Sequence, residues 1–345
     1  MKKRHVRCLH CHALTTKRNG TRRTKQGKVQ RFLCLTCHES FILTPELGQR
    51  ITTREKIKIT ETHLEGRTSI RTLARQTRHS TKTILEAIHL VTAQCVTAAW
   101  IAHTLNPQWS GYLALDGKVI RVWDWSARYF KYTQAERRWL HKMTLLLALD
   151  LGTLDVPCHH FGSEETAIDL VMFLTSLKEL GYPLNGYVSD GNPDIPRAVR
   201  KVFGTGIPHQ LCTSHYLRNL RVKYRQGQIT KEIYQDVRAA VTKGKQPKLM
   251  TVPKSLFTYQ TVPQLPRTNQ QMENCIRFLN LRLKTIGQFG SWLHAAHYCN
   301  ALVTMRRFTR FTDRKNGENG KAPLELAGCT IAKLKYLRLG FKSNR

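Results

Sequence analysis

The sequence has few acidic residues, because 23 Asp and Glu stand against 56 Lys and Arg, which gives 345 residues a formal net charge of +33. No apolar run approaches the roughly 20 residues that a membrane-spanning helix needs, so we expect no membrane partner. The N-terminal residues MKKRHVRCLHCH contain no apolar stretch of the kind found in secretory signals. No internal repeat is apparent, which disfavours a repeat architecture. We therefore expect a cytoplasmic protein.

The excess of basic residues predicts a polyanionic partner. A surface that only has to stay solvated rarely needs such an imbalance, so nucleic acid is the expected ligand. At 345 residues the chain is long enough for more than one domain. Ten cysteines in a chain without a secretory signal favour metal ligands and buried thiols over disulfides.

Two Cys-x-x-Cys pairs frame a basic insert in the first segment, residues 1–50. Cys8 and Cys11 form one pair, and Cys34 and Cys37 form the other. Two such pairs about twenty residues apart suit four thiolates around one tetrahedral Zn²⁺, and four protein ligands leave no open position for catalysis. The pattern predicts a zinc ribbon with one structural ion, whereas four unrelated cysteines are the alternative. The basic residues of the insert that we expect along DNA phosphates are Arg22, Arg23, Lys25 and Lys28.

The second segment, residues 51–106, is predicted to be helical. Ser69 and Ser80 suit N-cap positions, and a short turn at residues 78–80 separates two helices with apolar periodicity. Two helices joined in this way suit a helix-turn-helix domain whose second helix enters the major groove. The alternative is a helical hairpin with a solvated basic face. The residues expected near DNA are Arg75, Arg78, Lys82 and Thr83.

The third segment, residues 107–310, alternates predicted strands and helices after a boundary at Asn106-Pro107. Meandering strands followed by β-α-β units predict an α/β domain with a mixed sheet covered by helices. Residues 311–345 are predicted to form a basic tail. The strands are expected at residues 112–115, 119–122, 144–149, 156–161 and 186–189, and a helix is expected at residues 163–180.

Three carboxylates occupy positions that suit a divalent metal site. Asp116 and Asp190 each follow a predicted strand, and a carboxylate at a strand end is held rigidly at an open edge of the sheet. Glu273 lies in a segment with helical periodicity, and a helix across that edge would complete the site. Two Mg²⁺ ions about 3.5–4 Å apart can stabilise both the attacking and the leaving oxygen in phosphoryl transfer.

Each of these acids also has a plain structural interpretation. Asp116-Gly117 could be the tip of a hairpin, since Asp-Gly favours a type I′ turn, and Asp190-Gly191 could be a βα turn. Glu273 could be a solvated helix residue. Cys212-x-x-His215 lacks a second pair of metal ligands and is interpreted as structural. Composition leaves four other aspartates as candidate ligands: Asp124, Asp150, Asp155 and Asp194.

Three blocks of the third segment resemble bacterial insertion-sequence transposases of the DDE class. Ser189 to Asn219, which reads SDG, then A-x-x-x-x-F, then C-x-x-H-x-x-RN, resembles the second-aspartate block of the Mutator-type group. Asn269 to Arg282, with N-x-x-x-E and LN-x-R, resembles the third-acid block, and LALDGKVIRV around Asp116 is similar to the first. The resemblance covers about residues 110–310. The interval from His215 to Glu273 is shorter than the helical insertion usual in that group.

The resemblance implies an RNase H-like fold. In this fold Asp116, Asp190 and Glu273 bind two Mg²⁺ or Mn²⁺ ions, and Cys212 and His215 buttress the site. It also implies DNA transposition, a form of DNA recombination. A transposase of this class binds the terminal inverted repeats of a mobile element, hydrolyses phosphodiester bonds at the element ends and joins the 3′-hydroxyl ends to target DNA.

The resemblance also sets the expected partners. They are double-stranded DNA and further copies of the chain, as a homodimer or higher oligomer in the active complex, in association with the nucleoid. Two other functions stay open: a catalytically silent DNA-binding regulator derived from a transposase, and an RNase H-like nuclease without strand transfer.

Overall fold

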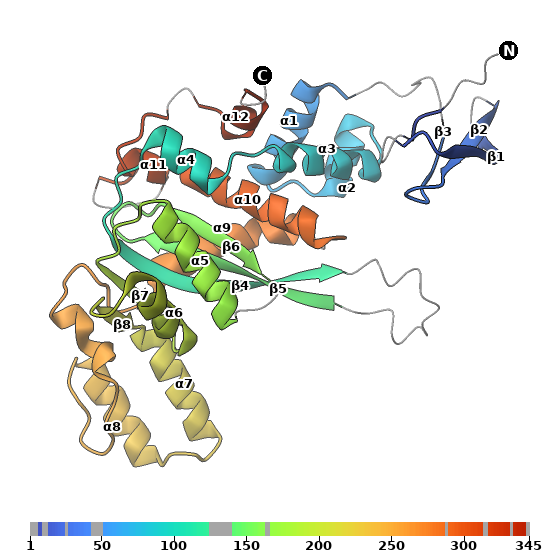
Figure 1. The fold of residues 1–345 in the computed structure, drawn as a ribbon. Coiled ribbons are helices and arrows are strands. Elements are labelled where there is room, and N and C mark those ends of the chain that lie inside the picture. The colour runs from blue at the N-terminus through green and yellow to red at the C-terminus, as the bar shows by residue number, and fades with distance from the viewer. Residues whose placement is uncertain are drawn as a thin grey trace. The chain divides into compact units, whose positions relative to one another are not determined.

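The computed structural model describes residues 6–8, 13–24, 27–42, 51–123, 140–162, 166–286, 289–312, 317–331 and 334–342. The chain divides into two compact units, Met1–Thr53 and Arg54–Arg345 (Figure 1). The predicted boundary near residue 50 falls close to this division, whereas the predicted boundary at Asn106-Pro107 lies inside the second unit.

The first unit contains a small antiparallel sheet in the order β1-β2-β3. Its strands are β1 (Thr16–Thr24), β2 (Gly27–Cys34) and β3 (Ser40–Ile42), so the strand predicted around residues 29–33 lies within β2. Phe32 and Phe41 stack with their ring centroids 5.8 Å apart, next to the buried Cys8 and Cys34. An apolar core of this size needs an additional source of stability, such as a bound metal ion.

The second unit begins with four helices: α1 (Thr53–Leu64), α2 (Ile70–Thr77), α3 (Thr81–Ala93) and α4 (Ala98–Leu105). The Ser69 hydroxyl accepts a hydrogen bond from the Thr72 N–H, and Ser80 accepts one from the Thr83 N–H. Both predicted N-caps are therefore confirmed. Arg78 ends α2 in the left-handed region with φ 59°, which turns the chain sharply into α3.

A five-stranded mixed sheet forms the centre of the second unit, in the order β6-β5-β4-β7-β8. The antiparallel half comprises β4 (Tyr112–Trp123), β5 (Leu140–Asp150) and β6 (Cys158–Gly162). β7 (Gly186–Ser189) pairs parallel with β4, and β8 (His209–Leu211) pairs parallel with β7. This order and these directions are those of an RNase H-like fold, which confirms the expected fold class.

One strand prediction is wrong. The sequence predicted two strands separated by Asp116-Gly117, but β4 runs unbroken through this pair (Figure 1). β5 pairs with β4 along its whole length, and Asp116 lies opposite Leu147. Because the backbone of Asp116 and Gly117 belongs to the ladder, the hairpin-tip interpretation is excluded, and Asp116 lies inside a strand instead of at its end.

Helices cover both faces of the sheet (Figure 1). On one face, α5 (Ala167–Glu179) and α6 (Asp194–Phe203) bury an apolar cluster against Leu113, Leu115 and Leu146. The helix predicted at residues 163–180 corresponds to α5, although residues 163–165 lie outside the described part. On the other side, α9 (Gln270–Ile286) contacts β4, and α10 (Trp292–Phe308) contacts β6 and α3.

The segment between β8 and α9 forms a separate helical layer. It comprises α7 (Thr213–Arg225), α8 (Lys231–Thr242) and the 3₁₀ helix η2 (Lys254–Gln260). Val237, Val241 and Leu256 are buried among them, and Tyr224 stacks on Tyr234 with the ring centroids 4.9 Å apart. This layer is anchored to the sheet because the buried Gln210 of β8 donates a hydrogen bond to the Leu256 carbonyl at 3.1 Å.

The C-terminal residues were predicted to form a basic tail, but their described part is packed. α11 (Pro323–Leu326) and α12 (Tyr336–Lys342) contribute Leu324 and Leu339 to an apolar cluster with Val96 and Ile101. Apolar residues placed between the basic ones give this segment a buried face, so it belongs to the compact second unit.

Within the described residues, no single helix has the length and apolar composition of a membrane span. α3 and α4 meet those criteria only as a pair bent by 45°. Their apolar residues Ile84, Ile88 and Ile101 are fully buried inside the protein.

A buried ion pair connects α10 to the loop between β5 and β6. The Arg307 guanidinium donates two hydrogen bonds of 2.7 Å to the Asp155 carboxylate, and the side chains are 1 % and 0 % exposed. The Trp109 indole N–H donates a third hydrogen bond to this carboxylate at 3.0 Å. The two parallel hydrogen bonds offset the desolvation of both charges. If one partner were removed, the other would stay buried as an uncompensated charge and would destabilise the fold.

We predict that Arg307→Met lowers the free energy of unfolding by about 3–5 kcal/mol, because it leaves the Asp155 carboxylate buried without its cation. Arg310→Met is the matched control, since the Arg310 side chain is 56 % exposed and pairs of this kind with a carboxylate such as Glu325 are worth about 0–1 kcal/mol. Urea denaturation monitored by circular dichroism gives both values. Equal losses of unfolding free energy in the two variants would show that the buried Arg307–Asp155 pair contributes no more to stability than the exposed pair.

Candidate functional site

The register of the parallel strands places Asp116 and Asp190 in one row. Ala114 pairs with Val188, so a count of two further residues along each strand brings Asp116 level with Asp190. Ser189 pairs with Leu211, so one further residue along each strand brings Cys212 level with Asp190. Neighbouring strands lie about 4.8 Å apart, and residues in register point to the same face. Asp116 in β4 and the residues that directly follow β7 and β8, Asp190 and Cys212, therefore occupy neighbouring register positions across the sheet.

α9 brings Glu273 to the same face. The Glu273 N–H donates to the Asn269 carbonyl at 3.0 Å in the first turn of this helix. Asn269 is 1 % exposed, and its side-chain amide donates to the Leu115 carbonyl and to Asp116 Oδ2, both at 3.3 Å. Its backbone N–H donates to Cys212 Sγ at 3.2 Å. Asn269 therefore fixes the start of α9 against both β4 and the residue that follows β8.

Cys212 and His215 connect the row to Glu273. His215 Nδ1 lies 3.2 Å from Cys212 Sγ, and His215 Nε2 lies 3.8 Å from Glu273 Oε1. The hydrogen bond to Cys212 is the main cause that raises the pKa of His215, and the Asp116 carboxylate raises it further. Burial alone would raise the pKa of the Cys212 thiol, but hydrogen bonds with His215 and from the Asn269 N–H outweigh burial and lower it. The imidazole is thus held between a sulfur and two carboxylates.

The three candidate acids are half-buried and individually oriented. Asp116 Oδ1 accepts a hydrogen bond from the Gly117 N–H at 2.8 Å, and Asp190 Oδ1 accepts one from the Asn192 N–H at 3.0 Å. The Glu273 side chain is 35 % exposed. Carboxylate oxygens are the donors that Mg²⁺ and Mn²⁺ prefer, so the donor set fits a divalent ion of this kind.

The ligand atoms of the three candidate acids do not all lie within 4.8 Å of one another. Among the described residues, the only group of three or more metal-ligating side chains whose ligand atoms all lie within 4.8 Å of one another is Cys8, Cys34 and Cys37. The acids are placed on one face by the sheet and α9, without forming so tight a group.

The other candidate aspartates have structural partners. Asp150 is fully buried and accepts hydrogen bonds from the Ser110 hydroxyl, the Thr153 hydroxyl and the Tyr182 hydroxyl. Asp155 is the partner of Arg307, and Asp194 pairs with Arg197 at 2.9 Å. Asp124 lies outside the described residues. These contacts account for the three described aspartates as parts of the fold.

Sequence reasoning assigned no role to Asn269, although it begins the block that contains Glu273. A signal was present in the residue type, because Asn just before a segment of helical periodicity suits the start of a helix. The contact with Asp116 joins residues 153 positions apart in the chain. Only the packing of α9 against β4 creates that contact.

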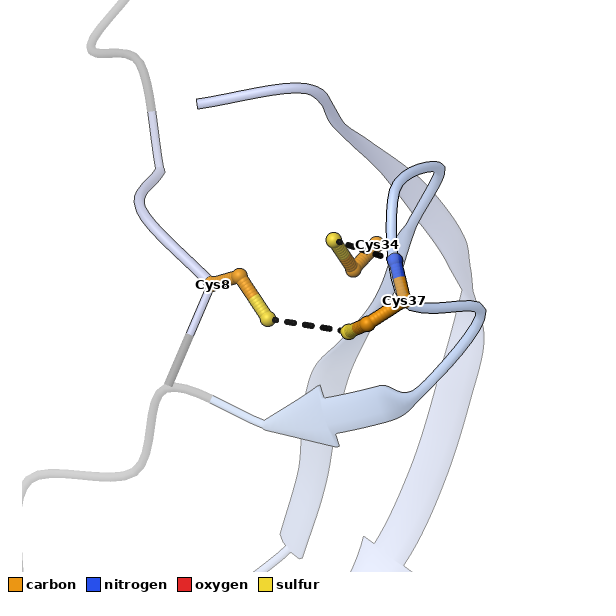
Figure 2. Close-up of side chains that lie close together, drawn as sticks. All are labelled: Cys8, Cys34 and Cys37. Atoms are coloured by element: carbon orange, nitrogen blue, oxygen red, sulfur yellow. Dashed lines mark hydrogen bonds between the residues drawn. The ribbon is translucent and has the colours of Figure 1, made fainter. Parts of the chain in front are cut away.

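Three of the four predicted zinc ligands converge in the first unit (Figure 2). Cys8 Sγ lies 3.6 Å from Cys37 Sγ, and the Cys37 N–H points to Cys34 Sγ at 3.5 Å. Thiolates around a tetrahedral Zn²⁺ with bonds of about 2.3 Å stand about 3.8 Å apart, so the sulfur separation fits this ion. Cys11 lies outside the described residues, and the other six described cysteines are buried thiols (Cys95, Cys158, Cys212, Cys275, Cys299 and Cys329).

The predicted DNA-contacting residues are mostly exposed. Arg23 of β1 lies directly opposite Lys28 of β2, and like charges in that relation repel each other unless an anion lies between them. Arg75, Arg78 and Lys82 are exposed around the turn from α2 to α3. Arg22 is also exposed, and Lys25 lies outside the described residues. Thr83 is half-buried, and its hydroxyl lies 2.7 Å from the Ser80 hydroxyl. Contact of these residues with DNA stays a prediction.

We predict that Asn269→Ala lowers the free energy of unfolding of the second unit by about 1–3 kcal/mol, because buried acceptors at Leu115 and Asp116 lose their donor. Asn274→Ala is the control, since Asn274 is an exposed asparagine of the same helix and should change stability by less than about 0.5 kcal/mol. Urea unfolding monitored by tryptophan fluorescence measures both. No difference between the two variants would contradict the proposed connection of α9 to β4.

We predict that Cys34→Ser abolishes zinc binding and unfolds the first unit, because thiolate ligation supplies folding free energy that so small a core lacks. Zinc content measured by atomic absorption and amide hydrogen exchange of residues 13–42 report the two effects separately. Cys299→Ala, at a buried cysteine of α10, should leave both unchanged. A full complement of zinc in Cys34→Ser would rule out this ligand set.

No protein-family model matches the chain, and no curated protein matches it. Among solved structures, the chain is similar to a chain of the simian T-cell lymphotropic virus intasome in complex with PP2A regulatory subunit B56 gamma. The sequence identity is 11 %, the match covers 80 % of this chain and 76 % of the intasome chain, and the TM-score is 0.27. It is also similar to one in the Drosophila P element transposase strand transfer complex, with 12 % identity over 86 % of this chain and 78 % of that one and a TM-score of 0.34. Both TM-scores are below 0.5, so neither similarity carries an argument about function, and the fold class rests on the strand order itself.

Proposed function

We propose that the chain is a DDE transposase of a bacterial insertion sequence, with a catalytic domain of the Mutator-like kind. The observation that carries the proposal is the row formed by Asp116 and Asp190 on the parallel strands of an RNase H-like sheet, with Glu273 on α9 beside it. The sheet holds two carboxylates in register, and the helix adds the third. Three acids so placed in a chain of net charge +33 suit metal-dependent chemistry on a polyanion.

Asp116, Asp190 and Glu273 are the residues that would hold two Mg²⁺ or Mn²⁺ ions. When bound, such ions stabilise charge on the attacking and leaving oxygens of a phosphodiester. The protein itself contributes position, because β4, β7 and α9 are rigid elements. His215 orients Glu273, and Asn269 orients Asp116 by donating to one of its oxygens. The proposed reaction is hydrolysis at the element ends followed by attack of the released 3′-hydroxyl on target DNA.

The remaining parts of the chain would recognise DNA. The zinc ribbon and the helix-turn-helix would bind the terminal inverted repeats through the exposed basic residues of the β1–β2 pair and of the turn between α2 and α3. A homodimer or higher oligomer would bring two element ends together. Double-stranded DNA is the proposed substrate and partner.

We predict that Asp190→Asn and Glu273→Gln each reduce Mg²⁺-dependent DNA cleavage by about a thousandfold or more, because loss of a metal ligand removes several kcal/mol of transition-state stabilisation. DNA binding measured in EDTA should stay equal to wild type or become tighter, since a repelling carboxylate is neutralised. Nicking of a supercoiled plasmid that carries the element ends, and joining of a labelled 3′-hydroxyl end duplex to a target plasmid, measure the two reactions.

Asp194→Asn is the matched control for the aspartate, because Asp194 lies four residues away and pairs with Arg197 on α6. Cleavage retained in Asp190→Asn would refute the site. Nicking without strand joining would favour the nuclease alternative. Tight DNA binding by the wild type with no nicking in any metal would favour the DNA-binding regulator.

A further inference from the structure

A groove begins beside Glu273 and runs between β4 and α9. Its volume is about 770 Å³, within the range of sites that hold ligands of several hundred daltons. One wall is the second half of β4, and the other is the face of α9 that carries Glu273. Both walls are regular secondary structure, so the groove is a fixed feature of the domain.

The groove is lined by positive charge. Lys118 and Arg121 come from β4, and Arg277 and Lys284 come from α9. Within the part of the chain that the structure describes, none of these four side chains forms a salt bridge with an acidic residue. Four cations without acidic partners around one groove attract an anion with several charges.

The α9 wall has a regular spacing. Glu273, Arg277, Asn280 and Lys284 all line the groove and follow one another at intervals of four, three and four residues. This spacing places them in a single stripe along the helix. From Glu273 to Lys284 the helix rises about 16 Å, which is long enough to contact more than one phosphate of a strand.

The groove also has apolar surface. Ile276, Leu283 and Phe289 line it, and the side chains of Val119 and Leu281 remain 49 % and 40 % exposed at its wall. A duplex exposes mainly phosphates to a protein groove, because its base faces are stacked inside. A single strand exposes sugar and base faces as well, which suit apolar side chains between basic ones.

We propose that this groove binds one strand of nucleic acid, with its phosphates on Lys118, Arg121, Arg277 and Lys284 and its course directed to Glu273. The direction toward Glu273 rests on the proposed function, whereas the binding of the strand does not. The groove would then keep the strand that is cut or joined separated from its complement at the acids.

The test is the salt dependence of binding to a fluorescent 20-nucleotide poly(dT), measured by anisotropy in EDTA with the full chain. Arg277→Ala/Lys284→Ala should reduce the slope of log K against log[salt] by about 1.4, since each single-strand phosphate contact contributes about 0.7. Both residues are exposed, so the melting temperature should not change.

The matched control is Arg197→Ala/Lys201→Ala, which removes one exposed arginine and one exposed lysine from α6, a helix that packs on the Leu113 and Leu115 face of the sheet. Its slope should equal that of the wild type. Equal slopes in all three proteins would overturn the proposal, and so would equal reductions in both variants. A reduction seen with a 20-base-pair duplex but absent with poly(dT) would overturn the single-strand assignment.

Failure of this inference can be told apart from failure of the proposed function. If the α9 variant loses slope while the wild type cleaves no DNA in Mg²⁺ or Mn²⁺, the groove is supported and the transposase assignment fails. If the slope is unchanged while Asp190→Asn abolishes cleavage, the groove is refuted and the enzyme assignment stands.

Discussion

The parallel pairing of β4 with β7 is the constraint on which the candidate site depends. These strands are separated in the chain by β5, β6 and α5, yet their register brings Asp116 level with Asp190. A slip of one residue would send one carboxylate to the opposite face, because side chains alternate along a strand. The long ladder between β4 and β5 and the apolar cluster under α5 and α6 oppose such a slip.

The same architecture separates structural acids from candidate functional acids. Asp150 and Asp155 are fully buried, and hydroxyl groups and Arg307 satisfy them. Asp116, Asp190 and Glu273 are half-buried and are oriented by backbone N–H groups and by one histidine. Burial thus separates Asp150 and Asp155, which stabilise the fold, from the three acids that remain available to a cation, whereas Asp194 is set apart by its pair with Arg197.

α9 joins the two aspects of the proposed activity. Its first turn carries Glu273 and, through Asn269, contacts both Asp116 and Cys212. Its next turns carry Arg277 and Lys284 along the groove. A rigid helix therefore relates the position of the acids to the path proposed for the nucleic acid, and a shift of α9 would disturb both at once.

The sequence by itself determined the features that local patterns encode: the caps at Ser69 and Ser80, the strand that ends before Asp190, and three converging cysteines. It misplaced Asp116, because Asp-Gly favours a turn locally while pairing with β5 keeps the strand continuous. It also treated the C-terminal segment as a tail, although Leu324 and Leu339 pack beside Ile101. Only the tertiary structure decided these points, the contact of Asn269 with Asp116 and the groove, because each depends on residues far apart in the chain.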